Sequence, residues 1–232
     1  MITSAYRETI PIFPLANVVL FPTITVPLYI FEPRYRAMLR AALQGEGRIG
    51  MVAMRPEVTN RPSDTPAVFS IGCEGELDEV HERDDGTFDI RLVASRRFTI
   101  VEELGVSESR PYRVAHVEPL DEEALPLQFE GFTALRQSIH QALGEIIQHA
   151  AGEEEASEAE SVAALKKLED FADEQFVHVV AQAVDFGVLE KQRLLEAPGT
   201  LARYQILDEL LRFQISALKA VSYTHLTLPT KA

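Results

Sequence analysis

Cysteine and lysine are the residue types whose scarcity limits the chemistry of this chain most. The 232 residues include one cysteine, Cys73, so an internal disulfide is excluded and a reducing cytoplasm is indicated. All five lysines lie at or beyond Lys166, and none of them follows a glycine. A phosphate-binding loop of the form G-x-x-x-x-G-K-[ST] is therefore missing from the sequence. We interpret Lys166 and Lys167 as residues on the solvated face of a helix rather than as activated bases.

A long uninterrupted apolar run is also missing. Residues 10–31 contain no charge, but four prolines divide them: Pro11, Pro14, Pro22 and Pro27. A helix that crosses a bilayer needs about 20 apolar residues with its backbone bonds closed internally, and proline prevents that closure. We expect short buried strands here, no membrane span and no signal peptide.

Positive charge is also scarce in this chain. The net charge is −14: residues 1–120 carry 13 basic and 17 acidic side chains, whereas residues 121–232 carry 9 basic and 19 acidic ones. A chain this negative repels phosphate backbones and anionic lipid, so nucleic-acid and membrane binding are disfavoured.

Metal-binding patterns are weak. The six histidines show no H-E-x-x-H spacing and have one thiol as a partner, so no zinc site is indicated. His81 and Glu82 precede Asp84 and Asp85, which allows a cation site, although a solvated turn is the commoner outcome. Cys73 on a predicted strand is most simply a small buried residue. We expect no metal and no cofactor.

The densest pattern is a strand followed at once by a helix. Residues 25–31 are rich in β-branched and aromatic side chains. Pro33 suits the first position of a helix, and apolar residues then recur at helical spacing until two glycines end the pattern: Tyr35, Met38, Leu39, Ala42, Gly45 and Gly47. We expect this helix to lie back over the sheet.

The runs IPIFPLANVVLFP and VPLYIFEPRYRAML closely resemble the opening of the Lon protease N-terminal (substrate-binding) domain. The resemblance continues more weakly through Ile71-Gly72, Asp85-Gly86 and Arg96-Arg97-Phe98, and covers residues 8–120. Ala94-Ser95 stands where the family usually has a glycine, so the backbone turn there is in question. We interpret the chain as a stand-alone form of the domain, without the ATPase and peptidase domains.

The remaining pattern predicts an α+β protein. Strands are expected at 48–54, 67–80, 87–94, 97–101 and 112–117, with a loop at 55–66 and a hairpin turn at 81–86. Together with the early helix they predict a small, partly closed β-barrel subdomain at 8–120, and the resemblance implies that this barrel is PUA-like.

Helical periodicity begins near residue 121 and predicts a bundle over 121–220. Stripes cover 129–147, 163–184, 189–195 and 201–218, and an acidic linker lies at 151–161. Residues 221–232 depart abruptly from this composition. We interpret them as an extraneous tail from cloning or sequencing read-through.

The resemblance implies a non-catalytic module that binds unfolded or exposed hydrophobic polypeptide segments in the cytoplasm. It further implies an adaptor or regulator of a separate ATP-dependent protease, as a monomer or an oligomer. The peptide-binding residues that it implies are Phe31, Glu32, Arg34, Tyr35 and Arg97. An open sheet edge that adds a peptide strand, or apolar surface between barrel and bundle, would supply the binding surface.

A purely structural explanation is also available for these residues. Tyr35 is also explained by packing under the helix, and Arg34 by pairing with an acid or a carbonyl at the barrel rim. Arg96 and Arg97 cannot both face inward on one strand, so one should point to solvent or a partner. The aromatic residues Phe13, Phe21, Phe31 and Phe98 are more simply core. For the whole chain, the alternatives are a structural or oligomerisation module and a small-ligand-binding barrel.

Overall fold

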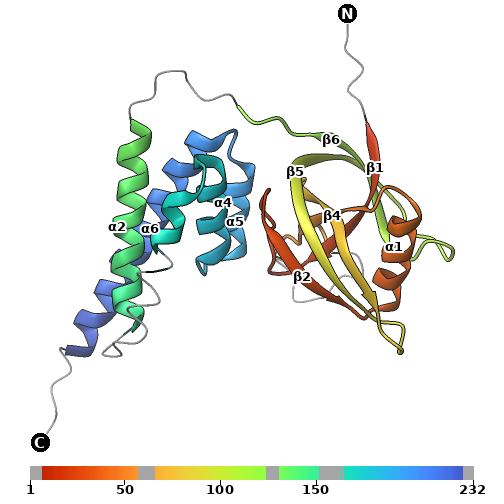
Figure 1. Cartoon of the computed structure of the whole chain (residues 1–232), viewed down its shortest axis with the longest axis horizontal. Helices are drawn as coiled ribbons and strands as arrows, with labels where there is room; N and C mark the ends of the chain where they lie inside the picture. The colour runs from red at the N-terminus through yellow and green to blue at the C-terminus, as the bar shows by residue number, and fades with distance from the viewer. Residues whose placement is uncertain (1–6, 57–65, 124–130, 152–162, 164, 227–232) are drawn as a thin grey trace, which may run out of the picture. The chain divides into compact units, whose positions relative to one another are not determined.

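The computed structural model describes residues 7–56, 66–123, 131–151, 163 and 165–226 (Figure 1). The chain divides into two compact units. The first, here the sheet unit, runs to Asp121 and also includes His178–Glu196; the second, here the helical unit, comprises Glu122–Val177 and the residues from Ala197 onward. Each unit is described by itself.

Six strands form one mixed sheet in the sheet unit: β1 Glu8–Leu15, β2 Thr25–Ile30, β3 Arg48–Ala53, β4 Ile71–Glu82, β5 Phe88–Leu104 and β6 Arg113–Pro119. Their order is β2-β5-β4-β3-β1-β6, and β5 also pairs with β6. The β1–β3 pair is parallel, and the other pairs are antiparallel. The α+β class, with one early helix and C-terminal helices, is therefore confirmed. Closure into a barrel stays a prediction.

The long strand β5 connects the two halves of the sheet. The sequence predicts two strands here, at 87–94 and 97–101, but β5 runs unbroken over 17 residues. Irregularities in its register with β4 and β6 allow it to bend, and Figure 1 shows the curvature of β4 and β5. At one irregularity Ser95 Oγ donates to Glu74 O at 3.2 Å. Ala94-Ser95 thus replaces the usual glycine at a bulge that Ser95 itself helps to satisfy.

Helix α1 spans Pro33–Gln44, with Pro33 in its first turn and Glu32 as N-cap. Its four buried residues are the predicted ones: Tyr35, Met38, Leu39 and Ala42. They join the main apolar cluster of the sheet unit, together with Phe13, Leu20 and Ile30. Gly47 has a φ of 69°, a left-handed value that favours glycine, and its N–H donates to Ala42 O at 2.9 Å. The predicted strand-to-helix switch is confirmed.

The other described helices are α2 Gly131–Ala151, α4 Asp173–Ala183, α5 Val188–Glu196 and α6 Thr200–Leu226. The predicted linker at 151–161 lies almost entirely outside the described residues. Helix α6 continues past Leu218, where the pattern predicted its end, into the segment interpreted as a tail.

The predicted continuous helix over 163–184 is wrong, because a 3₁₀ turn at Leu168–Asp170 and an extended Phe171 precede α4. The Arg136 guanidinium explains how this break is tolerated. Its Nη2 donates to the carbonyls of Leu168, Glu169 and Phe171 at 2.8, 3.1 and 2.9 Å, and its Nη1 donates to Asp173 at 2.7 Å. Carbonyls that leave a helix need such donors, and one planar fork supplies them.

Helix α5 belongs to the sheet unit, whereas the sequence assigned all of 121–220 to one bundle. Gln192 Nε2 donates to Ile71 O at 3.0 Å. Arg97 Nη1 donates to Leu195 O at 2.8 Å, and Arg97 Nη2 to Asp121 O at 3.5 Å. The Arg97 residue is only 2% exposed. The expectation that Arg97 lies at a peptide-binding surface is therefore corrected: the residue is buried, and these two bonds are to backbone carbonyls inside its own unit.

Two carboxylates and two guanidiniums form a closed network among β1, β3, β4 and β5. Arg48 Nη1 donates to Glu8 at 2.7 Å and to Glu74 at 2.6 Å. Arg96 Nη2 donates to Glu8 at 2.7 Å and to Glu74 at 3.2 Å. Glu74 is buried. Burial by itself would raise the pKa of the Glu8 carboxyl, but hydrogen bonds from Arg96 and Arg48 outweigh it and lower that pKa.

Replacing Glu8 with Gln should lower the free energy of unfolding by about 1–3 kcal/mol at pH 7. Because the folded-state pKa of Glu8 lies below its ordinary value of 4.5, this stabilisation is complete above that value. It is lost as the pH falls through the folded-state pKa. The difference between parent and variant should therefore shrink between pH 5 and about pH 3, as urea titrations at several pH values would measure.

Glu46→Gln is the matched control, since Glu46 also pairs with Arg48 but its side chain is 74% exposed. We expect a change below about 0.5 kcal/mol. A difference between parent and Glu8→Gln that stays constant down to pH 3 would contradict the ion-pair account.

Arg97→Met should destabilise the chain by about 2–3 kcal/mol, because buried carbonyls lose their donor. Arg91→Met, on the same strand but exposed, should cost less than about 0.5 kcal/mol. Chemical denaturation followed by circular dichroism measures both. An Arg97→Met protein with parental stability and impaired peptide binding would restore the surface role.

Candidate functional site

A groove in the sheet unit brings together four of the five residues that the family resemblance singled out. Its volume is about 320 Å³, and we call it the β1–β2 groove. It is lined by the end of β1, the end of β2, the start of α1 and one residue after β3: Phe13, Pro14, Leu15, Ala16, Leu28, Tyr29, Ile30, Phe31, Glu32, Arg34, Tyr35 and Met54.

Two exposed aromatic rings border this groove. Tyr29 is 49% exposed and Phe31 is 58% exposed, and their ring centroids lie 5.8 Å apart at an interplanar angle of 26°. They alternate with the buried Ile30, as side chains on an extended segment do. The expectation that Phe31 is core is therefore wrong, whereas Phe13, Phe21 and Phe98 are buried as predicted.

The floor and one rim come from the start of α1. Tyr35 is buried and packs on Phe13, with ring centroids 4.5 Å apart. Burial raises the pKa of Tyr35, so its phenol stays neutral. The Arg34 guanidinium lies 4.6 Å from the centre of the Tyr35 ring, and Arg34 Nε donates to Glu32 at 2.9 Å. The structural interpretations of Tyr35 and Arg34 hold, and both residues also line the groove.

A second guanidinium lies next to the exposed rings. The Arg83 guanidinium is 4.9 Å from the centre of the Tyr29 ring. Its Nε donates to Asp89 Oδ2 at 2.6 Å and its Nη2 to Asp89 Oδ1 at 3.0 Å. These bonds raise the pKa of Arg83. The turn that carries Arg83 is the predicted hairpin, in which Gly86 has a φ of 75°.

Sequence reasoning missed Tyr29 and wrongly included Arg97. Tyr29 was detectable, because it lies two residues before Phe31 in the predicted extended segment 25–31 and so should face the same way. Arg97 was not separable from Arg96 by pattern alone. The weaker statement, that one of the two points outward, is confirmed: Arg96 is partly exposed, and Arg97 is buried.

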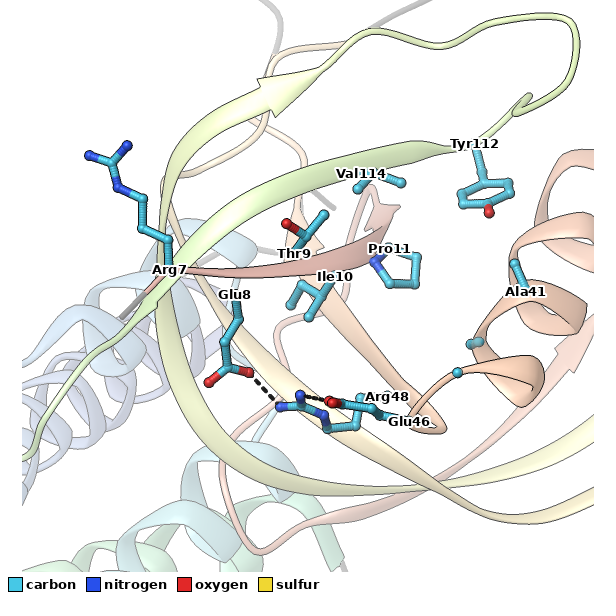
Figure 2. A pocket seen from close by; sticks show the side chains of 12 residues that line it. Arg7, Glu8, Thr9, Ile10, Pro11, Ala41, Glu46, Arg48, Tyr112 and Val114 are labelled. Carbon is cyan, nitrogen blue, oxygen red and sulfur yellow. Dashed lines mark hydrogen bonds and ion pairs between the residues drawn. The ribbon is translucent and has the colours of Figure 1, made fainter. Parts of the chain in front are cut away.

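A larger cavity of about 470 Å³ lies along the first half of β1, the end of α1 and the start of β6 (Figure 2). Figure 2 shows Glu8 and Glu46 both turned toward Arg48. Arg7, the remaining charged residue in the lining, pairs with Glu118 at 3.3 Å. Every charged side chain that lines this cavity thus has an ion-pair partner, and the cavity contains none of the family-implied residues.

Among the described residues, no group of three or more His, Cys, Asp or Glu side chains could hold a metal ion. At the hairpin tip, Asp85 accepts from Thr87 N at 2.9 Å and from Thr87 Oγ1 at 2.6 Å. Cys73 is buried as predicted. In the part of the chain that the structure describes, no helix has the length and apolar character to span a membrane.

Several known proteins are similar in sequence to this chain. Lon protease 2 of Herpetosiphon aurantiacus is 25% identical over 94% of this chain, which spans 25% of that relative. Lon protease of Flavobacterium johnsoniae is 28% identical over 84% of this chain and 23% of its own length. The chain thus spans about a quarter of the length of these curated relatives.

Solved structures share the fold. The N-terminal domain of Mycobacterium avium complex Lon protease superposes with a TM-score of 0.63 at 16% identity, covering 88% of this chain and 98% of that domain. The Lon N-terminal domain protein from Xanthomonas campestris has a TM-score of 0.59 at 18% identity, with the same coverage.

The family described as "ATP-dependent protease La (LON) substrate-binding domain" matches residues 9–212, which include the β1–β2 groove and most of both units. The expected resemblance is confirmed over nearly the whole chain, and this chain belongs to the LON substrate-binding domain family.

Proposed function

We propose that this chain binds unfolded polypeptide segments that carry exposed apolar side chains, and that the β1–β2 groove is the binding site. The observation that supports this best is the gathering of Phe31, Glu32, Arg34 and Tyr35 around one groove. The exposed Tyr29–Phe31 pair adds apolar contact surface at its border.

The energetics favour weak, general capture. An aromatic side chain buries roughly 150–250 Å² when covered, so covering the exposed half of two rings removes roughly 200 Å² from water. At about 25 cal/mol per Å² this contributes about 5 kcal/mol, before the costs of association and ordering. This patch alone therefore gives dissociation constants of about 0.2 mM or weaker for single segments. A folded protein keeps such segments buried and should bind less well.

The proposal also involves a second protein, an ATP-dependent protease. Lon protease relatives extend well beyond the quarter that this chain matches, and this chain has no nucleotide-binding motif of its own. We propose that it acts by binding alone, in the cytoplasm, as an adaptor or regulator of a separate ATP-dependent protease. A purely structural or oligomerisation role is the alternative.

Replacing both Tyr29 and Phe31 with Ala should weaken binding of a reduced, unfolded test protein at least tenfold, as loss of a central aromatic pair does. Fluorescence anisotropy against the unfolded and folded forms of that protein would measure it. Phe213→Ala is the matched control, since Phe213 is 69% exposed but lies on α6 of the helical unit.

Equal weakening by the control variant would show capture by any exposed ring and contradict a site at the groove. Equal binding of folded and unfolded forms, or none of either, would favour assembly with one specific folded partner. A pull-down from the native cytoplasm would then identify that partner.

The purified chain should neither hydrolyse ATP nor digest an unfolded protein unaided. Phosphate release and gel assays over several hours would measure this, with a complete ATP-dependent protease as positive control. Activity that co-purifies with the chain and disappears when one of its own residues is replaced would overturn the binding-only proposal.

A further inference from the structure

The strand β2 is an edge of the sheet. What it would bind is inferred below on the basis of the proposed function. Among the described residues β2 pairs with β5 alone, whereas β5 pairs with three strands. An edge strand presents a row of unpaired N–H and C=O groups that can template a further strand.

The register of β2 identifies which residues face outward. Ile24 O accepts from Ala94 N of β5 at 2.8 Å, and alternate residues of a strand direct their backbone groups to the same side. Val26, Leu28 and Ile30 therefore face β5, and Thr25, Pro27 and Tyr29 face outward. Proline has no N–H to donate, so its place at an outward position agrees with the rule that confines it to edges.

The outer edge of β2 borders the β1–β2 groove. Four consecutive residues, Leu28–Phe31, line it. Side chains of successive strand residues point to opposite faces, so a run of neighbours lines a cavity through its backbone edge. Residues 13–16 line the same groove, beyond Ile12, where the pairing of β1 with β6 ends.

We propose that the bound polypeptide is extended and adds as a strand to the outer edge of β2. Its N–H groups donate to the outward carbonyls of Thr25, Pro27 and Tyr29, and its carbonyls accept from the N–H groups of Thr25 and Tyr29. Its alternate side chains enter the groove over Tyr35. Backbone pairing supplies affinity for many sequences, and the groove selects apolar side chains.

The outer edge of β2 identifies the occupant as an extended polypeptide segment rather than a second copy of this chain. In a β2-to-β2 contact both strands would lack the N–H donor at Pro27. A segment without proline at the facing position supplies that donor. The guanidiniums of Arg34 and Arg83 are already paired with Glu32 and Asp89, so charge does not select the occupant.

The test uses a fluorescent ten-residue peptide of alternating Phe and Ser with Glu at both ends, and a series in which each backbone nitrogen in turn is methylated. We expect affinity to fall about three- to tenfold at every second position, the effect of one lost hydrogen bond. The intervening positions are the internal control.

If methylation lowered the peptide affinity equally at every position, while binding still depended on Tyr29 and Phe31, strand addition would be overturned. The proposed function would then still stand. Binding of neither peptide nor unfolded protein would overturn both. A parental chain that dimerises at micromolar concentration, as measured by sedimentation, and loses the dimer when peptide is added would assign the edge to a second copy.

Discussion

The fourfold network of Glu8, Glu74, Arg48 and Arg96 constrains the sheet on which everything else is built. Each carboxylate is bonded to both guanidiniums, so any shift of one strand would leave a buried charge without its partner, at a cost of several kcal/mol. Buried ion pairs add little net stability compared with apolar residues of similar size. Their contribution here is positional, because the network holds the start of β1 against β3, β4 and β5.

This position carries through to the groove. From Glu8 the strand β1 runs to Leu15 in register with β3, and its last residues form one wall of the β1–β2 groove. The end of β2 also lines the groove, and among the described residues the strand partner of β2 is the first half of β5. The second half of β5 pairs with β6. The bent strand β5 therefore pairs with the edge strand β2 through its first half and with β6 through its second half. Strand β6 in turn pairs with β1.

Local sequence patterns were sufficient to predict the structure of a segment whose own residues determine it. Pro33, the four apolar residues after it and Gly47 specify α1 without help from other segments, and Asp85-Gly86 specifies its hairpin. Patterns failed where distant groups decide. The helix break before α4 depends on Arg136, some thirty residues earlier, and the assignment of α5 to the sheet unit depends on Arg97 and Gln192. The family motif located Phe31, Glu32, Arg34 and Tyr35 at the groove. Only the contacts of Arg97 with Leu195 of α5 and with Asp121 reveal that Arg97 is buried.

An open edge next to exposed aromatic rings is a liability, because it can pair with any extended chain. Two features of β2 restrict that pairing. The strand has only six residues, and Pro27 removes one donor from its outer edge. Short edges and proline are among the devices by which native proteins block unwanted strand addition. Neither feature closes the groove, so they limit the length of what can bind and leave a segment of a few residues free to enter.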